Sequence, residues 1–310
     1  MRVLVTGATG FLGSHVTRAL VARGADVTVL VRRGSDPWRV ADVLPRLELV
    51  SADLAESEAS ARALQDAAPE VVCDLAWHGV GNRFHQDPSQ VSANLQAHLD
   101  LLATAARAGC RRWIGLGTQA EYGPQSARID ERCPPAPTTL YGAVKLSVGL
   151  LGGQLAAQAG MEFVWLRLFA SYGPMDEPGW LIPSVTLRLL RRERPDLTAG
   201  TQKWDYLFVE DAAGAVVEAA TAPTLDGVFN LGSGRGVAVR DIVEVIRDLI
   251  DPALPLGFGA IPYGPHQIMH LEADITRLCQ ATRWRPTTSL ADGLARTVEW
   301  YRDHRDRYAR

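Results

Sequence analysis

The chain has 310 residues, of which 47% are hydrophobic and 22% charged, and a formal net charge of −3. A chain of this length can bury a large core, and the composition is ordinary for a globular protein. The weak negative charge argues against nucleic acid or an anionic membrane surface as a partner. The four cysteines are widely spaced without a CxxC or Cys/His pattern, so no metal site is expected. We find no signal peptide and no apolar run close to the length of a membrane span, so we expect a cytoplasmic protein.

Short apolar runs rich in β-branched and aromatic residues alternate with helical stretches through the first half of the chain. The predicted strands are Val3–Val5, Asp26–Val31, Leu47–Ser51, Val71–Leu75, Trp113–Leu116 and Phe163–Arg167. Apolar residues recur at helical spacing between them, in Leu12–Arg23, Ser57–Ala68, Gln90–Ala108 and Leu140–Gly160. This alternation predicts an α/β fold, a doubly wound parallel sheet covered by helices on both faces.

The pattern breaks up after about residue 167, in a segment rich in Pro, Gly and Trp. A cationic helix follows it. Later elements are predicted as helices at Val209–Ala222 and Val239–Leu249, a strand at Gly227–Gly232 and a last helix from Leu290. We expect this part of the chain to be smaller and irregular.

The strand at Val3–Val5 runs into TGATGFLG, residues 6–13, and a helix follows at once. Gly7 permits a tight turn, Gly10 lets the backbone approach a pyrophosphate, and Gly13 lets helix and strand pack closely. The free N–H groups and positive dipole end of the helix favour phosphates. A glycine trio can be a mere tight turn, but its place at the first strand–helix junction indicates a dinucleotide site. The residues assigned to the cofactor are Gly7, Thr9, Gly10, Phe11, Leu12 and Gly13.

The second predicted strand ends at Val31, and Arg32 and Arg33 follow. A site that prefers NAD usually has a carboxylate here, which accepts from the ribose 2′-hydroxyl and would repel a 2′-phosphate. Arginine can instead hold such a phosphate through paired charge-assisted bonds. We therefore predict that Arg32 and Arg33 bind the cofactor and that NADP(H) is preferred. The alternative is that both are surface charges and NAD(H) serves as well.

Tyr141 and Lys145 are four residues apart in a predicted helix, so they share one helical face. A phenol with a pKa of about 10 is a poor acid–base catalyst at neutral pH, whereas a nearby ammonium favours the phenolate. Thr118 follows a predicted strand, and its hydroxyl could share a substrate carbonyl oxygen with Tyr141. Together with the glycine loop, these residues predict an oxidoreductase with Tyr141, Lys145 and Thr118 as its catalytic residues.

Taken in order, the motifs of the chain resemble the extended short-chain dehydrogenase/reductase family, especially its nucleotide-sugar epimerases, 4,6-dehydratases and 4-ketoreductases. The resemblance covers nearly the whole chain. The segments that carry it are TGATGFLG (6–13), GTQAEYG (117–123), YGAVK (141–145), RLFASYGP (167–174), WLIP (180–183), DYLFVEDAA (205–213), FNLGSG (229–234) and ADITRL (273–278).

The resemblance implies a Rossmann-type NAD(P)-binding domain, placed at 1–170, to which segments within about 205–232 can return. It implies a smaller mixed α/β domain at 171–310 that binds a nucleotide diphosphate-sugar. Members usually form homodimers through a four-helix bundle, here built from Gln90–Ala108 and Leu140–Gly160, although core burial explains their apolar faces equally well. The further cofactor contacts that it implies are Asp53, Leu54, Leu75, Ala76, Trp77, Asn94 and Phe169, with Tyr141 and Lys145.

Departures from the family pattern narrow the expected reaction. Dehydratases carry an Asp-Glu pair straight after the threonine, but this chain has Gln119 and Ala120, which cannot transfer a proton, and Glu121 is one residue out of register. Epimerases usually have an acidic residue after the second strand, which is missing here. We therefore predict a 4-ketoreductase for a nucleotide diphosphate-4-keto-6-deoxyhexose, in deoxysugar biosynthesis. The alternatives are a 4-epimerase with bound NAD and a non-enzymatic NADP(H)-binding regulator, which would have no use for the Tyr–Lys pair.

The substrate side departs from the family as well. The usual Asn is Ala170, an Arg that commonly precedes Asp205 is Trp204, and a later phosphate-binding Arg is Gly264. Other cations, such as Lys203, Arg188 or Arg235, would then have to meet the diphosphate. His78 either lines the sugar pocket or is a structural hydrogen-bonding residue. The predicted substrate contacts are His78, Thr118, Gln119, Ala170, Leu181, Ile182, Arg188 and Lys203.

Overall fold

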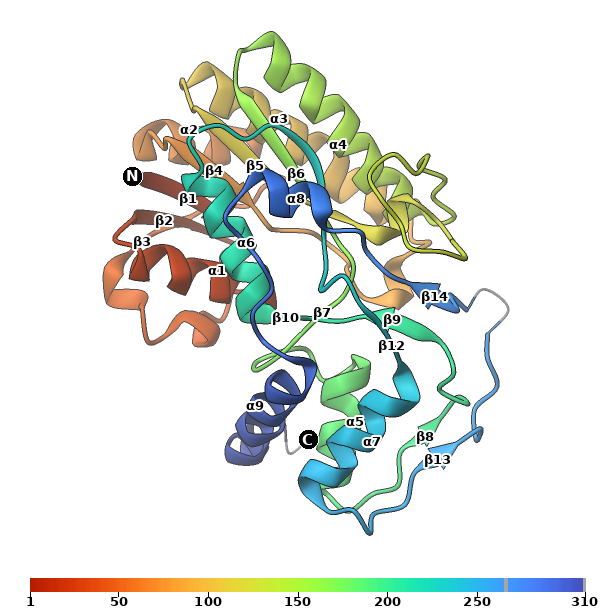
Figure 1. Cartoon of the computed structure of the whole chain (residues 1–310). Coiled ribbons are helices and arrows are strands. Elements are labelled where there is room, and N and C mark those ends of the chain that lie inside the picture. Colours follow the sequence, from red (N-terminus) through yellow and green to blue (C-terminus); the bar gives the residue numbers. More distant parts are fainter. Residues whose placement is uncertain (265–266, 309–310) are drawn as a thin grey trace.

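The computed structural model describes residues 1–264 and 267–308. Over these residues the chain forms a seven-stranded sheet in the order β11-β6-β5-β4-β1-β2-β3, with every neighbouring pair parallel (Figure 1). Its strands are β1 (Arg2–Thr6), β2 (Asp26–Val31), β3 (Leu47–Ser51), β4 (Val71–Asp74), β5 (Arg112–Thr118), β6 (Glu162–Leu168) and β11 (Gly227–Leu231). The central strands are nearly continuous apolar runs, as expected for a parallel sheet buried on both faces.

Helices cover both faces of this sheet. Their bounds are α1 (Phe11–Ala22), α2 (Ser57–Ala67), α3 (Gln96–Arg107), α4 (Leu140–Gln158) and α6 (Val209–Thr221). α1 and α6 pack together on one face, and α2, α3 and α4 cover the other (Figure 1). Alternate residues of a strand point to opposite faces, so β1 gives Val3 and Val5 to one core and Leu4 to the other. The doubly wound α/β fold predicted from the sequence is confirmed.

A third hydrophobic core lies among α5 (Leu181–Leu190), α7 (Val239–Ile250) and α9 (Leu290–Asp303), below the sheet in Figure 1. α7 shows how the sequence builds it, since Val239, Ile242, Val243 and Ile246 recur at helical spacing and are all buried. The remaining elements are β7 (Ser171–Tyr172), β8 (Asp196–Leu197), β9 (Lys203–Asp205), β10 (Leu207–Phe208), β12 (Gly236–Ala238), β13 (Gly257–Phe258), β14 (His270–Leu271) and α8 (Thr276–Ala281).

The chain returns to the large sheet after β9. α6 packs on α1, and β11 pairs with β6 at the sheet edge, from Gly227 opposite Val164 to Leu231 opposite Leu168. Asp205 fixes the start of this return, because its buried carboxylate accepts hydrogen bonds from the N–H groups of Ser233, Gly234 and Ala273. The division into two domains at residue 170 stays a prediction.

Two expectations about helices need correction. The segment predicted as one helix, Gln90–Ala108, instead has a π-helical turn at Val91–Leu95 before α3 begins. This turn lets the buried Asn94 amide donate back to the Gln90 carbonyl at 3.1 Å. In addition, α4 is long and apolar enough by length and composition to span a bilayer, with a mean hydropathy of 1.2. Helices that pack on a sheet pass the same test, and the buried Val148 and Ala156 of α4 lie in the sheet core.

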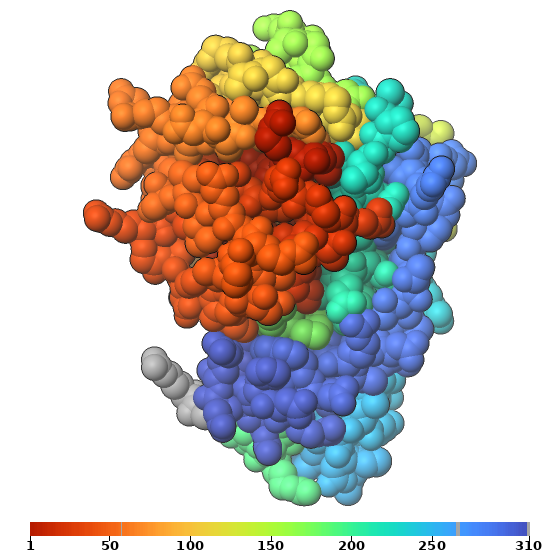
Figure 2. Space-filling model, turned by 90° about the vertical axis from the view of Figure 1, so that its left-hand side faces the viewer, coloured from red at the N-terminus to blue at the C-terminus, as the bar shows by residue number. Residues whose placement is uncertain are grey.

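The N-terminal and C-terminal parts of the chain meet on one face of the molecule. Figure 2 shows the red and orange surface of the first residues directly above the blue surface of the C-terminal helix. The contact includes Trp38, which follows β2 and stacks on Trp300 of α9 with ring centroids 6.4 Å apart. The segment after β2 is therefore held against the smaller part of the protein.

Candidate functional site

The glycine loop between β1 and α1 has the shape that a dinucleotide requires. Gly7 has a φ of +70°, and a Cβ there would lie 2.7 Å from the backbone nitrogen of Ala76. A Cβ on Gly13 would overlap the carbonyl oxygen of Gly7. Gly10 is the N-cap of α1, with no side-chain cap and no acidic residue in the first turn. The first N–H groups of the helix thus remain free for an anion, so the residues present fit the pyrophosphate of NAD(P).

The strand end beside this loop is fixed by buried hydrogen bonds. The Thr6 hydroxyl donates to Asp74 at 2.7 Å and accepts from the N–H groups of Leu75 and Ala76 at 3.0 Å each. These bonds hold Leu75 and Ala76 against the glycine loop, where the sequence predicts cofactor contacts. Asp74 also accepts from His98 of α3, with 2.6 Å between Oδ2 and Nδ1.

At the end of β2, Arg32 and Arg33 are exposed, and neither guanidinium has a hydrogen-bond or ion-pair partner in the part of the chain that the structure describes. The Asp53 carboxylate accepts from Ala55 within its own loop at 3.0 Å. Sequence reasoning missed Arg39, whose guanidinium donates to the carbonyls of Thr9 at 3.3 Å and Met175 at 3.0 Å. Arg39 thereby ties the glycine loop to the segment after β7.

The structure brings Thr118, Tyr141 and Lys145 together at the carboxyl end of β5 and the start of α4, with only 6%, 8% and 4% of their surfaces exposed. Burial raises the pKa of Tyr141 to about 12, and the Thr118 side chain opposes this because it can hydrogen-bond the phenolate. Burial lowers the pKa of Lys145 to about 7, against the attraction of Asp74 and Glu121. The Lys145 ammonium donates to the Leu116 carbonyl at 2.7 Å.

A loop after β4 caps the helix that carries Tyr141. The His85 carbonyl accepts from the Tyr141 N–H at 3.0 Å, and Gln86 Oε1 accepts from the Leu140 N–H at 3.2 Å. The His85 imidazole lies flat on the Tyr141 ring, with 4.7 Å between centroids and 6° between planes. Spacing in the sequence gives no sign of this contact, because 55 residues of other structure separate the two rings.

Thr118 is held in place by Glu121, which is fully buried. Glu121 Oε1 accepts from the Thr118 N–H at 2.9 Å, and Oε2 accepts from Arg167 Nε at 2.7 Å. The indole of Trp165 donates to the same carboxylate at 3.0 Å. Glu121 therefore points into the protein and takes no part in a substrate contact. Gln119 Oε1 is buried without a hydrogen-bond partner among the described residues.

Asn94, predicted to contact the cofactor, is bonded to the loop after β4. Its Oδ1 accepts from the His78 N–H at 2.8 Å, and its Nδ2 lies 3.2 Å from the His78 carbonyl. Together with the bond from Nδ2 to the Gln90 carbonyl, these contacts fix the backbone of the loop after β4. The His78 ring lies next to Phe84, with centroids 5.9 Å apart.

The other predicted substrate contacts lie in different parts of the structure and do not form one site. Ile182 is 1% exposed and belongs to the core of α5, α7 and α9, so the expectation of a side-chain contact there is corrected. Arg188 and Lys203 are exposed, on α5 and β9. Leu181 is half-buried at the start of α5, and the Ala170 carbonyl accepts from the Leu207 N–H at 2.9 Å. Phe169, predicted to contact the cofactor, is 6% exposed and packs in a small cluster with Tyr122.

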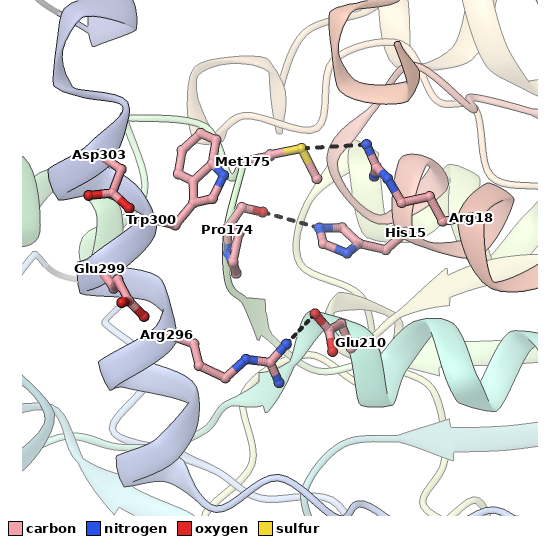
Figure 3. Close-up of a pocket in the computed structure, with 9 residues that line it drawn as sticks. All are labelled: His15, Arg18, Pro174, Met175, Glu210, Arg296, Glu299, Trp300 and Asp303. Carbon is pink, nitrogen blue, oxygen red and sulfur yellow. Dashed lines mark hydrogen bonds and ion pairs between the residues drawn. The ribbon is translucent and has the colours of Figure 1, made fainter. Parts of the chain in front are cut away.

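A separate hollow of about 480 Å³ lies between α1 and α9 (Figure 3). His15 and Arg18 line it from α1, and Arg296 and Trp300 line it from α9. Arg296 pairs with Glu210, and the His15 ring bonds the Pro174 carbonyl at 3.1 Å. None of the predicted site residues lines this hollow.

A glycine loop beside a buried Tyr–Lys–Thr cluster, on a doubly wound sheet, defines an enzyme of the extended short-chain dehydrogenase/reductase type. The chain belongs to the NAD dependent epimerase/dehydratase family, whose sequence model matches residues 3–232. A UDP-glucose 4-epimerase of Azospirillum brasilense is 30% identical, over 97% of this chain and 92% of that protein. The UDP-glucose 4-epimerase of Thermotoga maritima, solved with UDP-glucose, superposes with a TM-score of 0.89 at 26% identity, over 98% and 99% of the two chains. The UDP-glucose 4-epimerase of Thermus thermophilus, solved with NAD, superposes with a TM-score of 0.86 at 27% identity, over 97% of this chain and 99% of that chain.

Proposed function

We propose that the protein is an NAD-dependent 4-epimerase of a nucleotide diphosphate-hexose. The observation that carries this is the placement of Thr118 and Tyr141 at one strand end next to the glycine loop, with no acid at Gln119 or Ala120. Without a second proton-transfer group there, elimination of water from the sugar is not supported. The 4-epimerases among the similar proteins support epimerisation over the 4-ketoreduction first expected from the sequence.

The roles of the residues follow from their placement. Bound NAD would supply the hydride acceptor and donor, and inversion requires that the hydride taken from C4 of the sugar return to the opposite face of that carbon. Tyr141 takes the proton of the 4-hydroxyl as a phenolate and returns it as a phenol, and Thr118 holds the same oxygen by a hydrogen bond. The Lys145 ammonium favours the phenolate, which burial alone disfavours.

A 4-ketoreductase using NADP(H) is the second candidate, because Arg32 and Arg33 stand free at the end of β2 where a 2′-phosphate would be met. A homodimer through α3 and α4 and a cytoplasmic location stay predictions as well. Leu150 and Leu151 of α4, which are 61% and 47% exposed, support the dimer as apolar side chains left uncovered on that helix.

The test is interconversion of UDP-glucose and UDP-galactose by the purified protein without added cofactor, followed by chromatography, with bound NAD measured after denaturation. The Tyr141→Phe variant should lose at least about 100-fold in kcat and keep its NAD. Tyr122→Phe is the matched control, since it removes a buried phenol hydroxyl bonded to Asn230 near the site. Turnover only of a nucleotide 4-ketosugar with NADPH would replace the epimerase by the reductase, and no turnover of either would favour a regulator.

A further inference from the structure

The side chain of Trp77, directly after β4, contacts both members of the Tyr–Lys pair. The Lys145 ammonium lies over its indole, 3.6 Å from the ring centroid. The Tyr141 ring meets the indole edge to face, with centroids 6.2 Å apart and planes at 87°. A cation this close to an indole face is attracted by the ring quadrupole, most strongly where water is excluded. Lys145 is 4% exposed, so that condition is met.

The indole is itself fixed from two other directions. Its Nε1 donates to Gln90 Oε1 at 2.9 Å, and Gln90, which is fully buried, donates in turn to the Gly79 carbonyl at 2.7 Å. The imidazole of His98 stacks on the indole with 4.9 Å between centroids and 16° between planes. His98 is held by its 2.6 Å bond to Asp74. The ring therefore has little freedom to swing away from Lys145.

We propose that Trp77 is a positioning residue that holds the Lys145 ammonium at the carboxyl end of β5 through a cation–π contact. One N–H of the ammonium is used by the Leu116 carbonyl, and the indole face attracts the charge from a second side. The carboxylates that act on Lys145 are Asp74 and Glu121, and both favour its charged form. Burial works against that form, and the indole offsets part of this cost without adding a negative charge beside Tyr141.

The contact can be tested without substrate or cofactor, so its failure is distinct from failure of the proposed function, on which only the catalytic consequence rests. Lys145 and Lys203 are the only lysines of the sequence. A protein labelled with ¹³Cε-lysine therefore gives two sets of signals, assigned with Lys203→Arg. The Lys145 Hε signals should lie upfield of those of Lys203 because of the indole ring current. Their titration midpoint should fall by about one pKa unit in Trp77→Leu, with Trp77→Phe intermediate.

Trp284→Leu is the control, because Trp284 is a buried indole in the core on the opposite face of the sheet and donates to the Asp211 carbonyl. It should leave the Lys145 signals unchanged. If Trp77→Leu does not fold, Trp77→Phe carries the test alone. In an active enzyme, Trp77→Leu should lower kcat about tenfold at neutral pH with KM unchanged, and Trp77→Phe should recover part of it. A Lys145 midpoint that stays or rises in Trp77→Leu, or wild-type signals without an upfield shift, would overturn the proposal.

Discussion

The buried carboxylate of Glu121 should be a main determinant of both stability and site geometry. It accepts from the Thr118 N–H, the Trp165 indole and Arg167 Nε at 2.9, 3.0 and 2.7 Å, and its side chain is fully buried. In Glu121→Gln an amide N–H₂ replaces one oxygen and must face one of these donors. Breaking one side of a buried ion pair costs about 3–5 kcal/mol, since the other charge stays buried. That is a large part of the roughly 5–15 kcal/mol that keeps a protein folded.

Urea unfolding measures this loss, with the slope checked for constancy between variants. Glu58→Gln is the matched control, because Glu58 pairs with Arg62 at 3.5 Å while 91% exposed, and we expect it to change stability by less than about 0.5 kcal/mol. The double variant Glu121→Gln/Arg167→Met removes both charges, keeps an amide oxygen as an acceptor, and should be more stable than Glu121→Gln. A loss below about 1 kcal/mol in Glu121→Gln, or a double variant no better than the single one, would refute the reasoning.

Two other predictions concern packing and pH. On α4, a Cβ at Gly149 would lie 2.9 Å from the Trp165 ring, whereas a Cβ at Gly153 would make only ordinary contacts. Gly149→Ala should therefore lower the free energy of unfolding by about 1–3 kcal/mol, and Gly153→Ala should raise it by up to about 1 kcal/mol. Changes of the same sign in urea unfolding would contradict this prediction. Burial lowers the pKa of His15 to about 4, so its neutral form is required in the folded state. Stability should be complete above the unfolded pKa of about 6.5 and fall by about 3 kcal/mol as pH drops to about 4. His15→Gln should flatten that part of the stability–pH curve, and an unchanged slope would contradict the assignment.

The sheet could be predicted because its determinants are local. The bounds of β2 (Asp26–Val31) and β3 (Leu47–Ser51) agree with the predicted strands, since β-branched runs bounded by polar turns allow little else. The π-helical turn at Val91–Leu95 could not be predicted, because it depends on the Asn94 amide reaching His78 across the chain. The short strands after residue 170 were missed for another reason. A strand of two or three residues is too short to show an alternating pattern in the sequence.

The candidate site divides in the same way. The glycine loop and the pairing of Tyr141 with Lys145 depend on spacing within one turn or helix, and spacing is visible in a sequence. The orientation of Glu121 was not visible in the sequence, because its carboxylate is turned inward by Arg167, which lies 46 residues later. Nor could the sequence show that the Arg39 guanidinium donates to the carbonyls of Thr9 and Met175, whereas Arg32 and Arg33, directly after β2, are exposed.

The loop after β4 covers part of the Tyr141 phenol, the proposed proton-transfer group. One face of the Tyr141 ring is covered by the His85 imidazole, and the Trp77 indole meets the ring edge to face. Only 8% of the Tyr141 surface is exposed. In the proposed function, the reacting oxygen of the sugar binds between the hydroxyls of Tyr141 and Thr118. A substitution that opens the loop, such as His85→Ala, would widen this approach without touching a reacting group, so it should relax sugar selectivity more than it lowers turnover of the preferred substrate.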